Sequence, residues 1–214
     1  GQEAGEIALD GRIGGKPATG HARLTTAADG SGNLEALTLS VGSVNAKGTL
    51  SQAPDGRIAG DIALKAGNLD DLAPLTLTAL AAQLDATVKF DTDKSVQRIA
   101  VDATASGLRA SGSTVGSALI KLTVLDPLGT PKIDGTADLA NVRSGSLVID
   151  KATLAASNAQ GGTALKLTAT SLGASVDATA TLSAQGNASV LNLSALTIVK
   201  DGATATLAKP VSIT

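Results

Sequence analysis

Small aliphatic and polar residues alternate along almost the whole chain. Runs such as Leu37-Thr38-Leu39-Ser40-Val41, Ile99-Ala100-Val101-Asp102-Ala103 and Ser175-Val176-Asp177-Ala178 repeat with a period of two. Successive side chains of a β-strand point to opposite faces, so this period places the aliphatic residues on one face of a sheet. The pattern therefore predicts an all-β protein, an elongated antiparallel sheet with one apolar face.

Turn residues separate these runs at intervals of roughly 10 to 15 residues. The strongest signals are Asp-Gly pairs, because Asp tolerates the left-handed region and Gly occupies it without steric cost. The pairs are Asp10-Gly11, Asp29-Gly30, Asp55-Gly56 and Asp201-Gly202, and Gly14-Gly15, Gly161-Gly162 and Asn187 mark further turns. This spacing predicts about fifteen strands connected as hairpins.

Two segments interrupt the alternation. Asn68 to Pro74 predicts a capped helical turn, because the Asn68 side chain can accept from the following backbone and Pro74 disfavours a helical conformation at Ala73. From Leu75 to Leu84 a strand and a short helix remain alternatives. Leu125 to Pro131 holds two prolines and predicts a loop or sheet edge. Since the alternation resumes on both sides, we expect residues 1–214 to form a single elongated domain.

The chain lacks the bulky residues that usually fill a β-sandwich. It contains no Trp or Tyr, and Phe90 is its single Phe. Aromatic side chains bury large areas in such cores, so a face of Leu, Val, Ile and Ala without them favours a groove for another molecule. Phe90 shares a strand face with Val88, and we interpret it as a packing residue, with ligand contact as the alternative.

Charge and composition narrow the range of partners. The 17 basic and 19 acidic residues give a net charge of −2, and no basic patch with interleaved aromatics is present, which argues against nucleic acid. The longest apolar runs, such as Ala79 to Ala82, fall far short of the roughly 18 residues of a spanning helix, so no transmembrane segment is expected in this fragment. The absence of Cys excludes disulfides and thiolate metal sites. The absence of Met suggests a piece of a longer polypeptide.

Candidate chemistry is sparse. His21 is the single histidine and is most simply a solvent-facing strand residue. Asp70-Asp71 suits the start of a helix better than paired acid/base chemistry. Asp91-Thr92-Asp93 lacks the Gly and Glu of a calcium loop and predicts a turn after Phe90, while Gly112 to Gly116 lacks a P-loop lysine. We therefore expect neither an enzyme nor a cofactor or metal site.

Three stretches resemble the TamB family, the translocation and assembly module subunits of Gram-negative envelopes within the AsmA-like group. They are Gly67 to Leu75, Pro131 to Leu147 and Ala205 to Val211. The resemblance implies a β-taco, a long antiparallel sheet folded into a U-shaped trough with an apolar inner face. It also implies a periplasmic location, an inner-membrane anchor, and docking to a TamA-like outer-membrane barrel through regions outside this chain.

The family is associated with moving phospholipid between the two membranes and with assembly of outer-membrane proteins. A groove lined by small aliphatic residues suits phospholipid acyl chains, because apolar contacts are non-directional and similar from place to place. The expected lining residues are Leu37, Leu39, Val41, Ile62, Leu64, Val88, Ile99, Val101, Leu122, Val124, Leu147, Ile149, Leu165, Leu167, Val176, Leu191 and Leu193.

Two other classes of protein fit parts of the pattern. A β-helix, as in adhesin stalks, also stacks Val, Ile, Leu and Ala inside, but its interior would be closed and dry. A chaperone-like scaffold for outer-membrane barrel assembly would instead bind nascent strands at exposed sheet edges. Unpaired edges at the two ends of the sheet also predict end-to-end association of the fragment.

Overall fold

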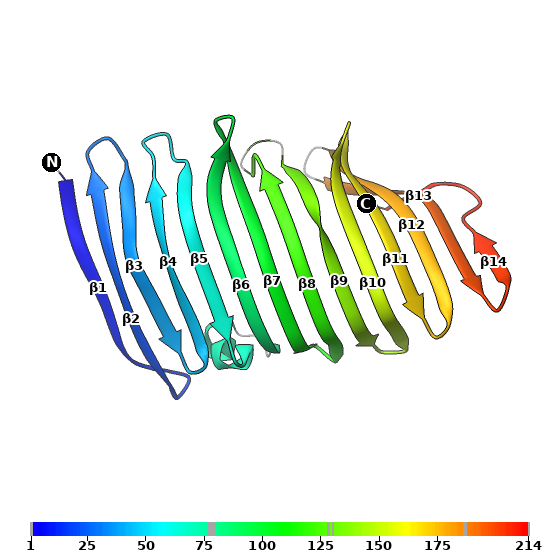
Figure 1. The fold of residues 1–214 in the computed structure, drawn as a ribbon, viewed down its shortest axis with the longest axis horizontal. Helices are drawn as coiled ribbons and strands as arrows, with labels where there is room; N and C mark the ends of the chain where they lie inside the picture. The colour runs from blue at the N-terminus through cyan, green and yellow to red at the C-terminus, as the bar shows by residue number, and fades with distance from the viewer. Residues whose placement is uncertain (1, 77–79, 128, 130, 186–187, 214) are drawn as a thin grey trace.

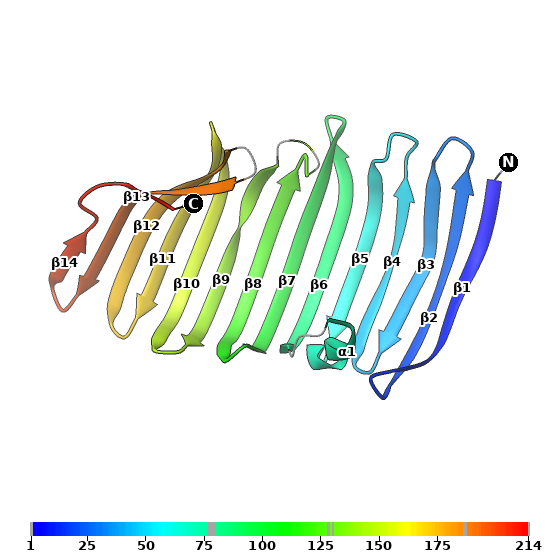
Figure 2. The same cartoon turned by 180° about the vertical axis from the view of Figure 1, so that it is seen from behind.

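The computed structural model describes residues 2–76, 80–127, 129, 131–185 and 188–213. Strands β1 to β14 lie side by side in chain order in one sheet, and β15 pairs with β13 (Figures 1 and 2). The strands are β1 (Gln2–Ile13), β2 (Lys16–Ala27), β3 (Gly32–Val41), β4 (Val44–Gln52), β5 (Ile58–Ala66), β6 (Leu80–Asp93), β7 (Val96–Ala110), β8 (Ser113–Leu125), β9 (Lys132–Ser144), β10 (Leu147–Ala159), β11 (Gly162–Ser171), β12 (Ala174–Gln185), β13 (Ala188–Lys200), β14 (Ala203–Thr206) and β15 (Val211–Ile213). A 3-10 helix, η1 (Leu69–Leu72), and one α-helical turn, α1 (Ala73–Thr76), lie between β5 and β6.

The architecture confirms the predicted fold class and number of strands. The sheet has 15 strands, every neighbouring pair is antiparallel, and the sheet does not close into a barrel. The result is an elongated, curved trough. A β-helix is the wrong alternative, because its coils would pair in parallel, whereas each strand here turns back on the one before it.

Most of the predicted turns are confirmed. Asp29-Gly30, Asp55-Gly56 and Asp201-Gly202 all lie between strands, and so does Gly161. Asn187 lies outside the described residues. The regular hairpin spacing was therefore a sound guide to the number of strands.

Two predicted turns are wrong. Asp10-Gly11 lies inside β1 and pairs with Thr19 and Ala18, because the chain reverses at Gly14-Gly15, whose φ angles of 55° and 80° form the preferred two-residue hairpin turn. Asp91 to Asp93 remains in β6. There the Asp91 carboxylate binds the guanidinium of its cross-strand partner Arg98 at 2.9 Å, and the chain turns later, at Lys94-Ser95.

The two irregular segments are confirmed, with one correction. Residues 69–76 are helical, and the Asn68 side chain accepts a hydrogen bond from the Asp70 amide at 3.1 Å. The expectation for Ala73 is wrong, because its backbone is helical (φ −51°, ψ −37°). Proline is tolerated in the first turn of a helix, where its missing N–H has no partner to lose, and α1 begins at Ala73. Leu80 to Leu84 belongs to strand β6, and β8 ends at Leu125 before a loop.

Glycines inside the strands allow neighbouring backbones to approach closely. Gly60 has φ 127°, and a Cβ there would overlap the Thr49 carbonyl oxygen of β4. Gly135 repeats this arrangement in β9 with φ 156°, against the Lys121 carbonyl oxygen of β8. No L side chain fits at either place, so these glycines are needed for the local bend of the sheet.

Candidate functional site: an apolar groove

Backbone pairing arranges the aliphatic side chains in continuous rows that cross the strands. Residues directly opposite one another in a ladder lie on the same face, so a chain of opposite partners defines a row. One row runs unbroken from β3 to β15: Leu37, Gly48, Ile62, Val88, Val101, Leu122, Gly135, Ala156, Leu165, Ala180, Leu193 and Val211. Every member is aliphatic or glycine.

Three more rows lie on the same face. The second comprises Leu9, Gly20, Leu39, Ala46, Leu64, Ala86, Ala103, Ile120, Ala137, Leu154, Leu167, Ala178 and Leu196. The third comprises Gly11, Ala18, Val41, Val44, Ala66, Leu84, Ala105, Ala118, Leu139, Ala152, Ala169, Val176, Ile198 and Ala205. The fourth comprises Gly5, Leu24, Leu34, Leu50, Gly60, Phe90, Ile99, Val124 and Ile133, and it resumes as Leu182, Leu191 and Ile213. Together they make a ribbon of hydrocarbon along the long axis of the sheet.

These rows hold all the predicted lining residues except Leu147 and Ile149. Those two lie in β10 opposite Ser144 and Val142 of β9. The β9–β10 ladder is interrupted at Asn141, which has a left-handed φ of 54°. Simple alternation along β10 therefore does not place Leu147 and Ile149 in the groove.

Sequence reasoning missed lining residues that carried the same signal. Leu9, Ile120, Leu154 and Leu196 occupy the second row, and Phe90 occupies the fourth, directly opposite Gly60. Their own strands alternate in the same way, so the pattern could have found them. The strand register, which the sequence does not display, was needed to place them in one row.

The groove is not filled by its own side chains. Among the described residues, the buried hydrophobic ones are Ala18, Ala22, Val41, Val44, Ala66, Ala82, Ala152 and Val190, with no Leu, Ile or Phe. Leu39 and Leu154 stay 38% and 40% exposed. A close-packed core would bury such residues almost completely. A hollow of about 330 Å³ lies on this face over β2 to β5, lined in part by Leu24, Leu34, Leu50 and Ile58.

A helical segment covers the groove along one edge, at the lower ends of the strands. Segment 69–76 lies at the lower end of β5, between β4 and β6 (Figure 2), and the Pro74 ring sits where a side chain on Gly14 would be. The buried residues Ala18, Val41, Val44 and Ala66 are neighbours in the third row, on the strands beside this segment. Val41 is only 1% exposed. The largest group of neighbouring buried residues therefore lies beside this segment.

Asp71 fastens this covering segment to the neighbouring turns. Its carboxylate accepts the Ser43 amide at 2.7 Å and forms an ion pair with the Lys16 ammonium at 3.1 Å. These interactions, led by the Ser43 amide, lower the pKa of Asp71 to about 2. The Asn68 amide also donates to the Ser43 hydroxyl at 2.8 Å. Asp71 is thus a structural anchor. Asp70 and Asp71 both lie in the first turn of η1, as the helix-start interpretation predicts.

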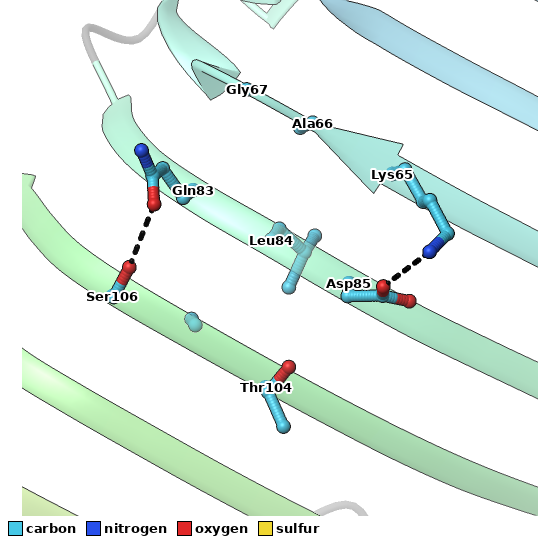
Figure 3. A pocket seen from close by; sticks show the side chains of 9 residues that line it. Lys65, Ala66, Gly67, Gln83, Leu84, Asp85, Thr104 and Ser106 are labelled. Atoms are coloured by element: carbon cyan, nitrogen blue, oxygen red, sulfur yellow. Dashed lines mark hydrogen bonds and ion pairs between the residues drawn. The ribbon is translucent and has the colours of Figure 1, made fainter.

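The opposite face of the sheet is polar. Lys65 and Asp85, on adjacent strands, form an ion pair at 2.7 Å, and the Ser106 hydroxyl donates to the Gln83 amide oxygen at 3.3 Å (Figure 3). These residues border a hollow of about 420 Å³. Leu119 is an exception on this face, because it pairs with Thr104 and Asp138 and is 40% exposed.

The single histidine lies away from the apolar rows. His21 is exposed on the polar face between Ala8 and Thr38. In the described part of the chain, no cluster of acidic and histidine side chains could hold a metal ion, and no helix is long and apolar enough to cross a membrane. The chain matches no known family model, no curated protein and no solved structure.

Proposed function

We propose that this chain is a periplasmic segment of a TamB-like bridge whose groove conducts phospholipid acyl chains between the inner and outer membranes. The observation that supports this proposal is the set of aliphatic rows, which continue across the sheet and remain half exposed. Docking to a TamA-like barrel and anchoring to the inner membrane belong to regions outside this chain.

The energetics favour a hydrocarbon cargo. Two acyl chains of about 30 methylenes would cost roughly 24 kcal/mol to carry through water, at about 0.8 kcal/mol each. Strands ~4.8 Å apart give this sheet a groove roughly 65 Å long, several times the length of one acyl chain. The tails would lie on the rows while the polar headgroup stays in water along the open side.

The lining also suits movement along the groove. Bulky residues face small ones across the strands, such as Leu122 opposite Gly135 and Ile62 opposite Gly48. Apolar contacts have no preferred direction, and the same kinds of side chain recur at every strand. A chain sliding along the groove therefore meets no single strong binding position.

A pair of leucines in one strand provides the test. Leu122→Arg places a charge in the groove, whereas Leu119→Arg places the same charge on the polar face of β8. We expect Leu122→Arg, and likewise Leu165→Arg, to reduce transfer of a fluorescent phospholipid between donor and acceptor vesicles at least tenfold. Leu119→Arg should remain within twofold of the unaltered protein, with circular dichroism confirming the fold of all variants. Equal transfer by Leu119→Arg and Leu122→Arg would refute the lining.

A chaperone-like scaffold for barrel proteins is the second candidate. In the described part of the chain β1 pairs on one side only, with β2, and its register is continuous from Gln2 to Ile13 without a bulge. Such an edge can accept an extended strand through backbone hydrogen bonds. Crosslinks from β1 to unfolded barrel protein, with no lipid bound, would favour this function.

A further inference from the structure

Two polar residues interrupt the fourth apolar row, between the part that ends in β9 and the part that resumes in β12. Asn158 of β10 and Thr163 of β11 are direct cross-strand partners, and Thr163 is also opposite Leu182. Asn158 follows Ala156 by two positions and Thr163 precedes Leu165 by two, so both lie on the face of the first row. We refer to Asn158 and Thr163 as the polar pair. All other members of the four rows are aliphatic residues, glycine or Phe90.

The nearby turn does not by itself require polar residues at these positions. The polar pair is the last pair but one of the β10–β11 ladder. At the same end of the sheet, the last pair but one of the β8–β9 ladder is Val124 opposite Ile133. The fourth row is therefore aliphatic right up to the loop in one hairpin and polar in the next.

The side chains of the polar pair are not used to hold the fold. Thr163 is only 6% exposed, yet among the described residues neither its hydroxyl nor the Asn158 side-chain amide has a hydrogen-bond partner. Valine has nearly the same shape as threonine and would fill this place without a polar atom, whereas a buried hydroxyl without a partner is costly. In this part of the chain the fully enclosed polar atom without a partner is Asp91 Oδ1, so the Thr163 hydroxyl still reaches the surface.

We propose that the polar pair binds the ester carbonyl of a glycerolipid whose acyl chains lie on the apolar rows, an inference that rests on the proposed function. The Thr163 hydroxyl and the Asn158 side-chain N–H both donate to a carbonyl oxygen. In a glycerolipid the ester carbonyls lie where the acyl chains meet the polar headgroup. The polar pair lies at the corresponding boundary of the sheet, between the aliphatic rows and the β10–β11 turn (Figure 1).

A neutral acceptor fits this site better than a phosphate group. The polar pair contains no cation, and strong phosphate sites use Arg or Lys. The Asp134 carboxylate accepts the Asn158 backbone N–H at 3.0 Å, so the charge bound to this end of β10 is negative. Asp134 would repel a phosphate but not an ester carbonyl.

The polar pair orients a lipid without trapping it. A hydrogen bond to the carbonyl replaces one to water, so its net effect on binding is modest. A lipid bound here would have its headgroup toward the β10–β11 turn and its acyl chains on the rows.

Comparison of an ester-linked and an ether-linked lipid tests this inference on the whole 214-residue chain. Dioleoyl phosphatidylcholine and its diether analogue share a headgroup and chain length, and both can displace a fluorescent phospholipid from the groove. We expect the unaltered protein to bind the diester about fivefold more tightly. Thr163→Val should reduce this preference to less than twofold, and Thr163→Ser, which keeps the hydroxyl, should retain it. Thr168→Val is the matched control on the other face of β11, opposite Thr153 and Asp177, and should also retain it.

Two further measurements separate ligand binding from a structural role. The infrared band of a ¹³C-labelled ester carbonyl should lie at lower frequency when bound to the unaltered protein than when bound to Thr163→Val. The urea midpoint of Thr163→Val should equal or exceed that of the unaltered protein, because no internal hydrogen bond is lost. A lower midpoint would show that the hydroxyl holds the fold and would overturn the proposal.

The outcomes also separate this inference from the proposed function. Equal binding of diester and diether by the unaltered protein would overturn the role of the polar pair and leave the apolar groove standing. Binding of neither lipid would contradict the lipid groove itself, and the polar pair with it.

Discussion

The first five strands and the strands from β6 onward carry the same apolar rows, but the residues in these rows differ in how they are covered. In the first region segment 69–76 is bound to the turns at Lys16 and Ser43, beside the third row, and Val41 and Val44 are buried. From β6 onward the described buried apolar residues, Ala82, Ala152 and Val190, are scattered over three strands, and Leu154 is 40% exposed. The same pattern of residues is thus a small core where it is covered and an open groove where it is not.

This contrast shows that the alternation along the sequence determines the face of a residue but not its burial. Where no second layer lies on the sheet, contacts between adjacent side chains bury small residues such as Ala152 but leave longer ones such as Leu154 partly exposed. A second layer is required to remove the rest of the surface from water. In the part of the chain that the structure describes, eight helical residues supply such a layer, and they cover one corner.

A charged residue introduced into each region should give the largest difference in unfolding free energy. Val41→Asp would bury an unpaired carboxylate, and we expect it to cost at least about 4 kcal/mol of unfolding free energy. Leu122→Asp keeps its charge near water and should cost about 1 to 2 kcal/mol. Urea denaturation followed by circular dichroism measures both. Equal shifts of the two midpoints would contradict the distinction between covered and open regions.

Replacing a glycine at a bend of the sheet should have a smaller effect on the unfolding free energy. Gly60→Ala places a methyl group against the Thr49 carbonyl oxygen at a φ that L residues avoid, and should cost about 2 kcal/mol or more. Gly5→Ala is the control, because a Cβ there meets nothing within 4 Å. Its unfolding free energy should stay within about 0.5 kcal/mol of that of the unaltered protein. Tolerance of Gly60→Ala would show that the sheet does not need this bend.

Lowering the pH should give the smallest effect on stability, and this effect should be confined to the covered region. The folded pKa of Asp71, about 2, lies below the ordinary value of 3.8, so its carboxylate stabilises the fold fully above that value. This contribution is lost as the pH falls from about 4 to 2, where the folded protein also takes up the proton. The amide resonance of Ser43 should report this titration by NMR.

The neighbouring carboxylate supplies the control for the acid experiment. Asp71→Asn should abolish the titration at Ser43, and Asp70→Asn, on the same turn, should preserve it. A Ser43 resonance that titrates in the Asp71→Asn variant would show that another group holds the turn.

The fold was largely predictable from the sequence because one signal, the period of two, extends through the whole chain. It placed Val88 and Phe90 on one face and predicted the sheet without any long-range information. The turn at Asp10-Gly11 failed because two turn signals lie close together and the Gly14-Gly15 pair forms the tighter hairpin.

The arrangement of the side chains in rows could not be predicted from the sequence. A row depends on the register of every ladder it crosses, including bulges such as the one between Leu34 and Leu37. The Gln97 side chain is likewise hydrogen-bonded to the Ile58 backbone, although β7 and β5 are not neighbours in the sheet. Nothing in the local pattern around Gln97 distinguishes it from an ordinary polar strand residue.

Mass spectrometry of lipids that co-purify with the chain tests the central claim most directly. If foreign hydrocarbon occupies the apolar rows, the unaltered protein and Leu119→Arg should carry phospholipid, and Leu122→Arg should carry at least tenfold less. A chain free of lipid, or equal lipid in Leu119→Arg and Leu122→Arg, would contradict it.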